Sequence, residues 1–468
     1  MSTLVAAPAG SSAILPEALL RSFDTPGPRY TSYPTADRFS DAFGAGDLQA
    51  ALARRAAGAA APLSLYVHIP FCESVCYYCA CNKVITKHHE RAVEYLDALD
   101  IEVGLTAAAL GPRQQVSQLH FGGGSPTFLA DAELDRVMAS LRRSFDIAAD
   151  AEVSIEVDPR TVTPQRLAYL RGIGFNRLSF GVQDFDPRVQ EAVHRVQPLE
   201  SVRVLMKSAR ELGFESINAD LIYGLPLQTP ESFARTVAQI GELRPDRIAL
   251  YAYAHLPQRF KPQRRILAAE LPDGTQRVAM LGGAIAGFLG RGYTYIGMDH
   301  FALADDALAV AKREGRLHRN FQGYSTQPDC DLVAFGVSAI GKIGSTFHQN
   351  AKTLPEYYAA LRQGQLPVVR GMSLSDDDRV RRDVIMALMC QGRVEFASIE
   401  ATHPIRMRED FATELARLAT LAEAGLVDIE AGAIQVTTTG WYLVRAVAMV
   451  FDRYLRDDKF RDRFSRII

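Results

Sequence analysis

From residue 63 onward, short apolar runs alternate with longer amphipathic segments. The runs with strand character cover residues 63–69, 116–121, 152–157, 177–182, 216–223 and 247–253. The segments with helical periodicity cover residues 90–109, 132–145, 164–171, 188–212 and 230–243, and Gly172, Gly174 and Gly213 stand where helices should end. Parallel strands need helical crossovers. The alternation therefore predicts an α/β fold, with a parallel sheet that is closed or partly closed as a barrel. A helix at 276–289 and a strand at 293–297 would add another unit.

Every expected strand carries polar or glycine-rich residues or leads to them. The first strand runs into the cysteines of residues 72–81 and the second into Gly122 to Ser125. The third ends at Glu156 and Asp158, the fourth ends at Gln183 and Asp184, the fifth carries Asp220, and the sixth leads to Ala254 and His255. In α/β barrels the chemistry gathers at the C-terminal ends of the strands. These side chains are therefore predicted to meet at one rim.

Four of the six cysteines lie within ten residues, at Cys72, Cys76, Cys79 and Cys81. Three thiolates in a Cys-x3-Cys-x2-Cys loop can hold three corners of a cubane iron–sulfur cluster and leave the fourth iron open to a small ligand. Four cysteines also suit zinc, but zinc sites usually combine two separate knuckles, and no second knuckle follows in the sequence. The spacing favours a cluster and leaves zinc open.

The glycine run and Glu156 each have two interpretations. Glycines let backbone N–H groups approach an anionic or zwitterionic ligand, but a tight strand-to-helix turn uses them too. Glu156 could form a structural ion pair, for instance with Arg160, or face a cationic ligand. The segments 297–302, 318–327 and 336–341 are expected to be loops that close over the rim. Their histidines, His300 and His318, are more often structural than catalytic.

The remaining chain divides into an arm and a second domain. Residues 1–55 are expected to form an N-terminal arm, loosely ordered up to about residue 25 and extended at 28–35, which either packs on the surface or covers a polar ligand. The barrel is expected over 56–370. A mainly helical, winged-helix-like domain is expected over 371–468, with helices at 376–387, 410–424 and 441–455 and a hairpin between the last two. Its second helix is acidic and apolar, which favours a lid or docking role over DNA binding.

Composition excludes several classes of protein. The net charge is −2, so no basic field indicates nucleic acid or an anionic membrane as a partner. No apolar run reaches the length of a transmembrane helix, and the N-terminus lacks the basic start of a signal peptide. Only Cys330 and Cys390 lie outside the cysteine-rich residues 72–81. This distribution of cysteines fits a reducing, cytoplasmic compartment better than a disulfide scaffold.

Taken together, these motifs resemble the radical S-adenosylmethionine (SAM) superfamily, and within it the oxygen-independent coproporphyrinogen III oxidases. The resemblance rests on segments spread over nearly all of the chain, at residues 28–35, 72–81, 122–126, 154–160, 180–184, 220–226, 253–257, 297–301 and 318–324. It implies a partial (β/α) TIM-like barrel of the radical SAM type, with an extended N-terminal arm and a mainly helical C-terminal domain.

The resemblance also implies cofactors and the residues that bind them. A [4Fe–4S] cluster is expected on Cys72, Cys76 and Cys79, while Cys81 is not a ligand. One SAM is expected near Tyr66, Gly123, Glu156 and Ile340. A second SAM is expected near Tyr78, Gly124, Ser125, Gln183, Arg195, Asp220 and Ala254. Ser125 stands where relatives often have Thr, and both residues supply a hydroxyl.

The implied reaction converts two propionates of coproporphyrinogen III to vinyl groups, giving protoporphyrinogen IX. The implied partners are this substrate and an electron donor such as flavodoxin or ferredoxin, and a monomer is expected. Arg29, Arg160, Arg319 and Lys342 are candidate anchors for substrate carboxylates, unless they form ion pairs within the protein. The rival is a haem-binding chaperone of the same superfamily. Such relatives typically lack the arm motif and carry a bulky apolar residue in place of Cys81, so both features favour the oxidase.

Overall fold

The computed structural model describes residues 25–58, 61–111, 113–298, 300–455, 464 and 466. The expectation of a loosely ordered N-terminal segment up to about residue 25 lies outside the described residues, as does Asp299.

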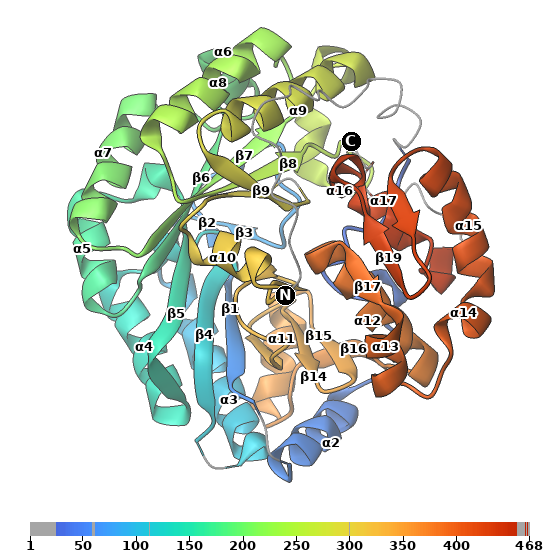
Figure 1. The fold of residues 1–468 in the computed structure, drawn as a ribbon. Helices are drawn as coiled ribbons and strands as arrows, with labels where there is room; N and C mark the ends of the chain where they lie inside the picture. Colours follow the sequence, from blue (N-terminus) through green and yellow to red (C-terminus); the bar gives the residue numbers. More distant parts are fainter. Residues whose placement is uncertain are drawn as a thin grey trace.

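A twelve-stranded sheet forms the curved wall of the molecule (Figure 1). In spatial order its strands are β16 (Val368–Ser373), β15 (Thr346–Asn350), β14 (Ile340–Ile343), β13 (Leu332–Phe335), β1 (Leu63–Ile69), β4 (Gln115–Gly123), β5 (Asp146–Val157), β6 (Arg177–Gln183), β7 (Ser216–Tyr223), β8 (Arg247–Ala252), β10 (His300–Leu303) and β9 (Tyr293–Gly297). The run from β13 to β8 is parallel throughout. In this order β16 and β9 are the two edges, so the predicted α/β fold with a partial barrel is confirmed.

Helices cover the outer face of the sheet (Figure 1). They are α2 (Ala45–Ala56), α3 (Arg91–Leu110), α4 (Asp131–Ser144), α5 (Pro164–Gly172), α6 (Pro187–Ala192), α7 (Leu199–Glu211), α8 (Pro230–Leu243), α9 (Gly274–Leu289), α10 (Ala307–Arg313) and α11 (Leu354–Arg362). The single helix predicted over 188–212 is wrong, because the chain breaks between α6 and α7. His194 has a positive φ of 55° there, and Pro198 starts the next helix, so the break turns the buried Arg195 into the protein.

Residues 290–350 differ most from the sequence-based expectation. The predicted strand β9 forms, but β10 runs antiparallel to β8 and lies between them. Segments expected to be loops contain strands: β10, β14, and the hairpin of β11 (His318–Asn320) and β12 (Gly323–Ser325). These strands are only three or four residues long, and their polar residues give no strand pattern in the sequence. They become strands because they pair with neighbouring segments.

The C-terminal elements lie on the side where the sheet stays open (Figure 1). They are α12 (Asp376–Gln391), β17 (Arg393–Glu395), α13 (Phe396–Thr402), α14 (Met407–Asp410), α15 (Ala412–Glu423), β18 (Val427–Ile429), β19 (Ala433–Val436), α16 (Thr438–Tyr442) and α17 (Val444–Met449). Ser375 and Asp378 form a capping box at the start of α12. The single final helix predicted over 441–455 is instead divided between α16, α17 and a short 3-10 turn. The domain boundary expected at 370 falls within β16.

The arm is buried between the two parts of the molecule. Tyr30 and Tyr33 are fully buried, and the Tyr30 hydroxyl donates to Asp452 Oδ2 over 3.0 Å. On the barrel side, Ser40 pairs with Gly371 at the edge strand β16. The arm thus joins the C-terminal domain to the sheet. Among the described residues, no helix combines the length and the apolar character needed to span a bilayer.

Candidate active site

The cysteine loop (residues 72–81) leaves the end of β1. It is tied down by β2 (Phe71–Cys72), which pairs with β3 (Val84–Ile85) after the loop has turned. Cys76 is buried, Cys72 and Cys79 are partly buried, and Cys81 is exposed. Burial raises the pKa of the Cys72 thiol to about 12, and the nearby thiols of Cys79 and Cys76 add to the rise. The three predicted cluster ligands therefore lie close to one another.

The loop fits an iron–sulfur cluster better than a zinc ion. In the described part of the chain, no three His, Cys, Asp or Glu side chains converge as ligands of a single metal ion. A zinc ion needs that convergence, whereas in a cubane each thiolate binds a different iron. Arg195 Nη1 and Arg160 Nη2 lie 3.4 Å and 3.5 Å from Cys76 Sγ, so two guanidinium groups border this cysteine.

Both of these arginines form ion pairs with Asp158, which follows β5. Arg160 Nη2 lies 2.6 Å and Arg195 Nη1 lies 3.2 Å from Asp158 Oδ2. Burial alone would raise the pKa of Asp158, but hydrogen bonds from Arg160 and the charge of Arg195 hold it below its usual value. Arg160 thus pairs with Asp158, and the considered ion pair with Glu156 does not form.

Glu156 instead faces the interior of the barrel. Its carboxylate accepts from the Gly123 N–H (3.2 Å) and lies 3.4 Å from His120 Nε2, and 43% of its side chain remains accessible. It keeps accessible surface towards the interior and has no arginine or lysine partner among the described residues. This position suits contact with a cationic ligand.

The glycine run allows β4 to approach the cysteine loop. A side chain at Gly124 would lie 2.7 Å from the Pro70 carbonyl oxygen, and Gly123 has a φ of +118°. The N–H groups of Gly124 and Ser125 donate to the Ile69 and Phe71 carbonyls over 2.8 Å and 2.9 Å. The run therefore fixes the loop against the sheet, and the amides of Gly124 and Ser125 are already used for that purpose.

Tyr66 is oriented by a histidine that the sequence reasoning missed. His68 Nε2 lies 3.0 Å from the Asn82 carbonyl oxygen, so this nitrogen carries the proton, and Nδ1 accepts from the Tyr66 hydroxyl at 3.1 Å. Burial lowers the pKa of His68, which keeps the ring neutral. The two-residue spacing of Tyr66 and His68 on one face of β1 was the available signal.

The residues expected at the second SAM lie around the same rim. Gln263 Nε2 donates to the carbonyls of Tyr78 (2.9 Å) and Ala254 (3.1 Å) and so connects the cysteine loop to the end of β8. A side chain at Gly181 would lie 2.9 Å from both Arg195 Nη2 and Gln183 Nε2, so these two groups are also neighbours. Gln263 was missed, since nothing in its local sequence marks it.

Asp220 lies deep on β7 and is held by two polar neighbours. Ser179 Oγ and Asn218 Nδ2 donate to its carboxylate over 3.0 Å and 2.9 Å. Burial raises the pKa of Asp220 to about 6, and the charge of Glu156 adds to the rise. Asp220 and Glu156 thus form an acidic end of the barrel interior.

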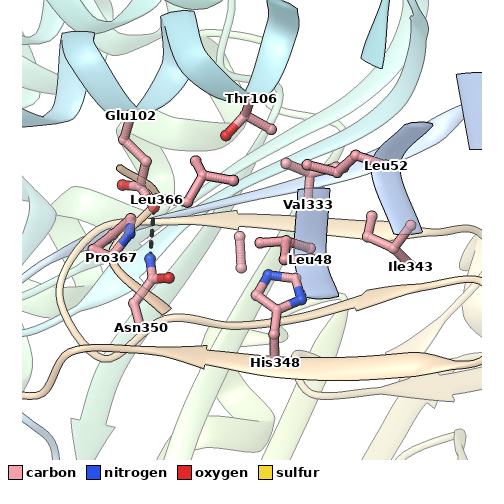
Figure 2. Close-up of a pocket in the computed structure, with 11 residues that line it drawn as sticks. Leu48, Leu52, Glu102, Thr106, Val333, Ile343, His348, Asn350, Leu366 and Pro367 are labelled. Atoms are coloured by element: carbon pink, nitrogen blue, oxygen red, sulfur yellow. Dashed lines mark hydrogen bonds between the residues drawn. The ribbon is translucent and has the colours of Figure 1, made fainter. Parts of the chain in front are cut away.

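Ile340 starts β14, directly after a turn that a buried carboxylate holds. Glu102 accepts hydrogen bonds from the Gly336 N–H (2.8 Å), Asn350 Nδ2 (2.6 Å) and the Tyr357 hydroxyl (2.6 Å). Figure 2 shows the bond from Asn350. Burial raises the pKa of Glu102 to about 7 against these donors. Glu102 was missed, although a lone carboxylate on the apolar face of the predicted helix 90–109 was a visible signal.

The four candidate carboxylate anchors separate into two groups. Arg160 pairs with Asp158, and Lys342 Nζ lies 2.7 Å from Asp329. By contrast, buried nitrogens of Arg29 and Arg319 make no hydrogen bond to any described residue. Only the latter two thus have unused donors.

The partial parallel barrel, with a three-cysteine loop after its first strand, defines a radical SAM protein. Comparison with known proteins agrees, since residues 66–240 match the Radical SAM superfamily and residues 374–443 match the HemN C-terminal domain. The chain is 50% identical over 451 residues to the oxygen-independent coproporphyrinogen III oxidase of Escherichia coli, covering 96% of this chain and 98% of that protein. The enzyme of the same name from Pseudomonas aeruginosa is 49% identical over 452 residues, with the same coverage. The chain therefore belongs to the oxygen-independent coproporphyrinogen III oxidase family.

The solved structure of coproporphyrinogen III oxidase (HemN) from Escherichia coli, a radical SAM enzyme, matches with a TM-score of 0.88 at 50% identity. The match covers 91% of this chain and 98% of that chain. Membership of the superfamily implies a [4Fe–4S] cluster and SAM as cofactors.

Proposed function

We propose that this protein oxidatively decarboxylates two propionate side chains of coproporphyrinogen III to vinyl groups and so forms protoporphyrinogen IX. The observation that carries the proposal is the near full-length similarity to enzymes named for this substrate. This chain also carries the arm motif and Cys81, the two features that favoured an oxidase over a haem chaperone.

In this proposal Cys72, Cys76 and Cys79 hold the cluster, and two SAM molecules bind around it. Tyr66, Gly123, Glu156 and Ile340 line the first SAM. Tyr78, Gly124, Ser125, Gln183, Arg195, Asp220 and Ala254 line the second. When bound, the reduced cluster and SAM supply a 5′-deoxyadenosyl radical that removes a hydrogen atom from the propionate β-carbon, after which loss of CO2 and of one electron to an acceptor leaves the vinyl group.

The chain's own residues orient these groups and keep out water. His68 holds the Tyr66 hydroxyl towards the rim, and Glu102 holds the turn that carries Ile340. The carboxylate of Glu156 faces the interior, where it suits the positive charge of SAM. The buried arm, with Tyr30 and Tyr33, closes the open side of the barrel.

The proposal includes partners that follow from the chemistry. Each turnover needs a one-electron donor such as flavodoxin or ferredoxin. The confinement of most cysteines to one loop suits a reducing cytoplasm, and we propose that the protein works there as a monomer.

The test is anaerobic incubation of the reconstituted protein with dithionite, SAM and coproporphyrinogen III. We expect release of two CO2 per substrate together with methionine and 5′-deoxyadenosine, and no release by the Cys76→Ala variant. Stable binding of haem without CO2 release would overturn the proposal in favour of the chaperone.

A further inference from the structure

Tyr251 on β8 lies within electrostatic reach of four charged side chains. Burial raises the pKa of Tyr251 above its usual range, Asp220 and Glu156 add to the rise, and Arg29 and Arg319 oppose it. Even so, 37% of the residue's surface is accessible. An acidic pair and a basic pair thus both act on Tyr251.

The basic pair belongs to a group of five side chains that we call the arginine cage: Arg29, Tyr251, His300, Arg319 and Tyr324. Three segments contribute to it, since Arg29 comes from the arm, Tyr251 and His300 from the edge of the sheet, and Arg319 and Tyr324 from the β11–β12 hairpin. The guanidinium of Arg29 lies 5.5 Å from the centre of the Tyr251 ring, and that of Arg319 lies 4.6 Å from the Tyr324 ring. The His300 ring meets both tyrosine rings edge-on, at 5.9 Å and 5.5 Å.

Among the described residues, no carboxylate forms an ion pair with either arginine of the arginine cage. Arg319 is only 5% exposed, and its Nε and Nη1 make no hydrogen bond to a described residue, nor does the buried Nη2 of Arg29. Burial lowers the pKa of Arg319, and the charge of Arg29 lowers it further. Burial and Arg319 also lower the pKa of His300 to about 3, so this ring is neutral. Arg319 is buried and Arg29 is partly buried, and neither has an anionic partner among the described residues. Burying a cation without such a partner is costly, and the chain avoids that cost elsewhere, for example where Arg381 meets Glu414.

We propose that Arg29 and Arg319 form a carboxylate-binding site that takes a propionate of the substrate, and that the arm completes this site. A planar guanidinium with free N–H groups matches a carboxylate in a bidentate fashion. The inference rests on the proposed function, because it takes coproporphyrinogen III as the source of the carboxylate.

The position of the arginine cage indicates which propionate it holds. Charge-assisted hydrogen bonds stabilise a carboxylate before it reacts, and that stabilisation would raise the barrier to losing CO2. The acidic pair lies among the residues proposed to bind SAM: Glu156 is on β5 and Asp220 on β7, on one side of β8, whereas His300 of the arginine cage is on β10, on the other side of β8. The arginine cage therefore holds a propionate that is not reacting, while another propionate of the same substrate faces the cofactors.

The test measures binding of coproporphyrin III, the fluorescent oxidised form of the substrate, to the cluster-loaded full chain. Hydrogen bonds to charged groups make Arg319→Gln and Arg29→Gln each expected to weaken binding by about 10- to 100-fold. The matched control is Arg316→Gln, an exposed arginine near the start of the same hairpin that pairs with Glu314, and its affinity should equal that of the wild type. Equal affinity of the wild type and both cage variants would overturn the proposal.

The tetramethyl ester of coproporphyrin III isolates the carboxylate. Esterification should weaken binding to the wild type and should leave the ester equally weak on wild type and Arg319→Gln. An ester that binds the wild type as tightly as the free acid overturns the proposal, as does a wild type that binds neither.

A second experiment measures the binding of SAM by equilibrium dialysis. Loss of SAM binding in the cage variants, with coproporphyrin III unaffected, would assign the site to the SAM carboxylate and overturn the proposal.

The proposed function and this inference fail separately. If the wild type releases CO2 from coproporphyrinogen III while the cage variants bind and react normally, only the inference fails. If the wild type binds coproporphyrin III through both arginines but releases no CO2, the proposed function fails and the carboxylate site stands.

Discussion

Two pairs of arginines differ in how their charges are balanced. Beside the cysteine loop, Arg160 and Arg195 share the carboxylate of Asp158, and both reach the sulfur of Cys76. In the arginine cage, Arg29 and Arg319 lie against aromatic rings. Each pair has one buried and one partly buried arginine, but among the described residues only the first pair has an anionic partner.

The site beside the cysteine loop is thus formed before a ligand binds, whereas the arginine cage needs a bound ligand to balance its charge. Around the cysteine loop, ion pairs and the glycine run hold the rim in place before any cofactor binds. The uncompensated positive charge of the arginine cage is electrostatically unfavourable, and a bound carboxylate would compensate it. Part of the binding free energy therefore comes from removing this unfavourable energy of the ligand-free protein. Four predictions test this contrast.

The largest expected effect concerns the cysteine loop. Cys72→Ala, Cys76→Ala and Cys79→Ala should each abolish the cluster and SAM cleavage, because each removes the ligand of one iron. Cys81→Ala should keep both. Iron and acid-labile sulfide after anaerobic reconstitution measure the result. If Cys81→Ala also loses its iron, four thiolates bind the cluster, and the open-iron site has to be abandoned.

The second prediction compares how much the two groups of arginines contribute to the stability of the ligand-free protein. Arg195→Met should lower the free energy of unfolding by about 3 kcal/mol, because it breaks a buried ion pair and leaves Asp158 with one partner. Arg319→Met should leave the ligand-free protein equally stable or stabilise it by about 1 kcal/mol, because it removes an unbalanced charge. Urea unfolding of the ligand-free protein measures both. Arg316→Met is the exposed control, and a loss of equal size at Arg195 and Arg319 would remove the contrast.

The third prediction concerns Glu102, a buried carboxylate whose hydrogen-bond donors are all neutral. Glu102→Gln should cost about 2 kcal/mol, because an amide accepts fewer hydrogen bonds and its NH2 would face a donor. SAM affinity should fall as well, since the turn before Ile340 loses its support. Denaturant unfolding and SAM dialysis measure the two effects. Lower stability with unchanged SAM affinity would limit Glu102 to a structural role.

The smallest effect is a pH dependence at the acidic end of the interior. The pKa of Asp220 is raised to about 6 in the folded protein, so the folded state binds this proton more tightly than the unfolded state. The resulting stabilisation is complete below the ordinary pKa of Asp and is lost as pH rises through about 6, at no more than about 1.4 kcal/mol per pH unit. The stability difference between wild type and Asp220→Asn should therefore change between about pH 4 and pH 6. A constant difference over that range would contradict the prediction.

Most of the parallel part of the sheet could be predicted from the sequence, whereas the parallel strand β13 and the antiparallel extension could not. The strands β1 and β7 lie at the predicted residues, because their apolar runs are buried on both faces. The short strand β13 was missed although all of its residues are buried, since four apolar residues alone do not distinguish a strand from other buried segments. Its pairing with β1, more than 250 residues earlier in the chain, is a tertiary property.

The same distinction holds for the candidate site. Residues at strand ends, such as Glu156 and Asp220, follow from the rule for parallel barrels. Glu102 and Gln263 act through partners far away in the chain, and the sequence does not identify those partners. His68 differs, since it orients Tyr66, two residues away on the same strand. The sequence also could not tell which cations are neutralised. The acid Asp158 stands two residues before Arg160, but nothing near Arg319 in the sequence shows that it has no such neighbour.

The burial of the arm bears on the order in which the site is assembled. Tyr30 donates to Asp452, a residue 422 positions later in the chain. During synthesis the arm leaves the ribosome first, but its binding surface is made last. Arg29 can therefore take its place only when nearly the whole chain has folded, and the first cage residue to be translated is the last to be positioned.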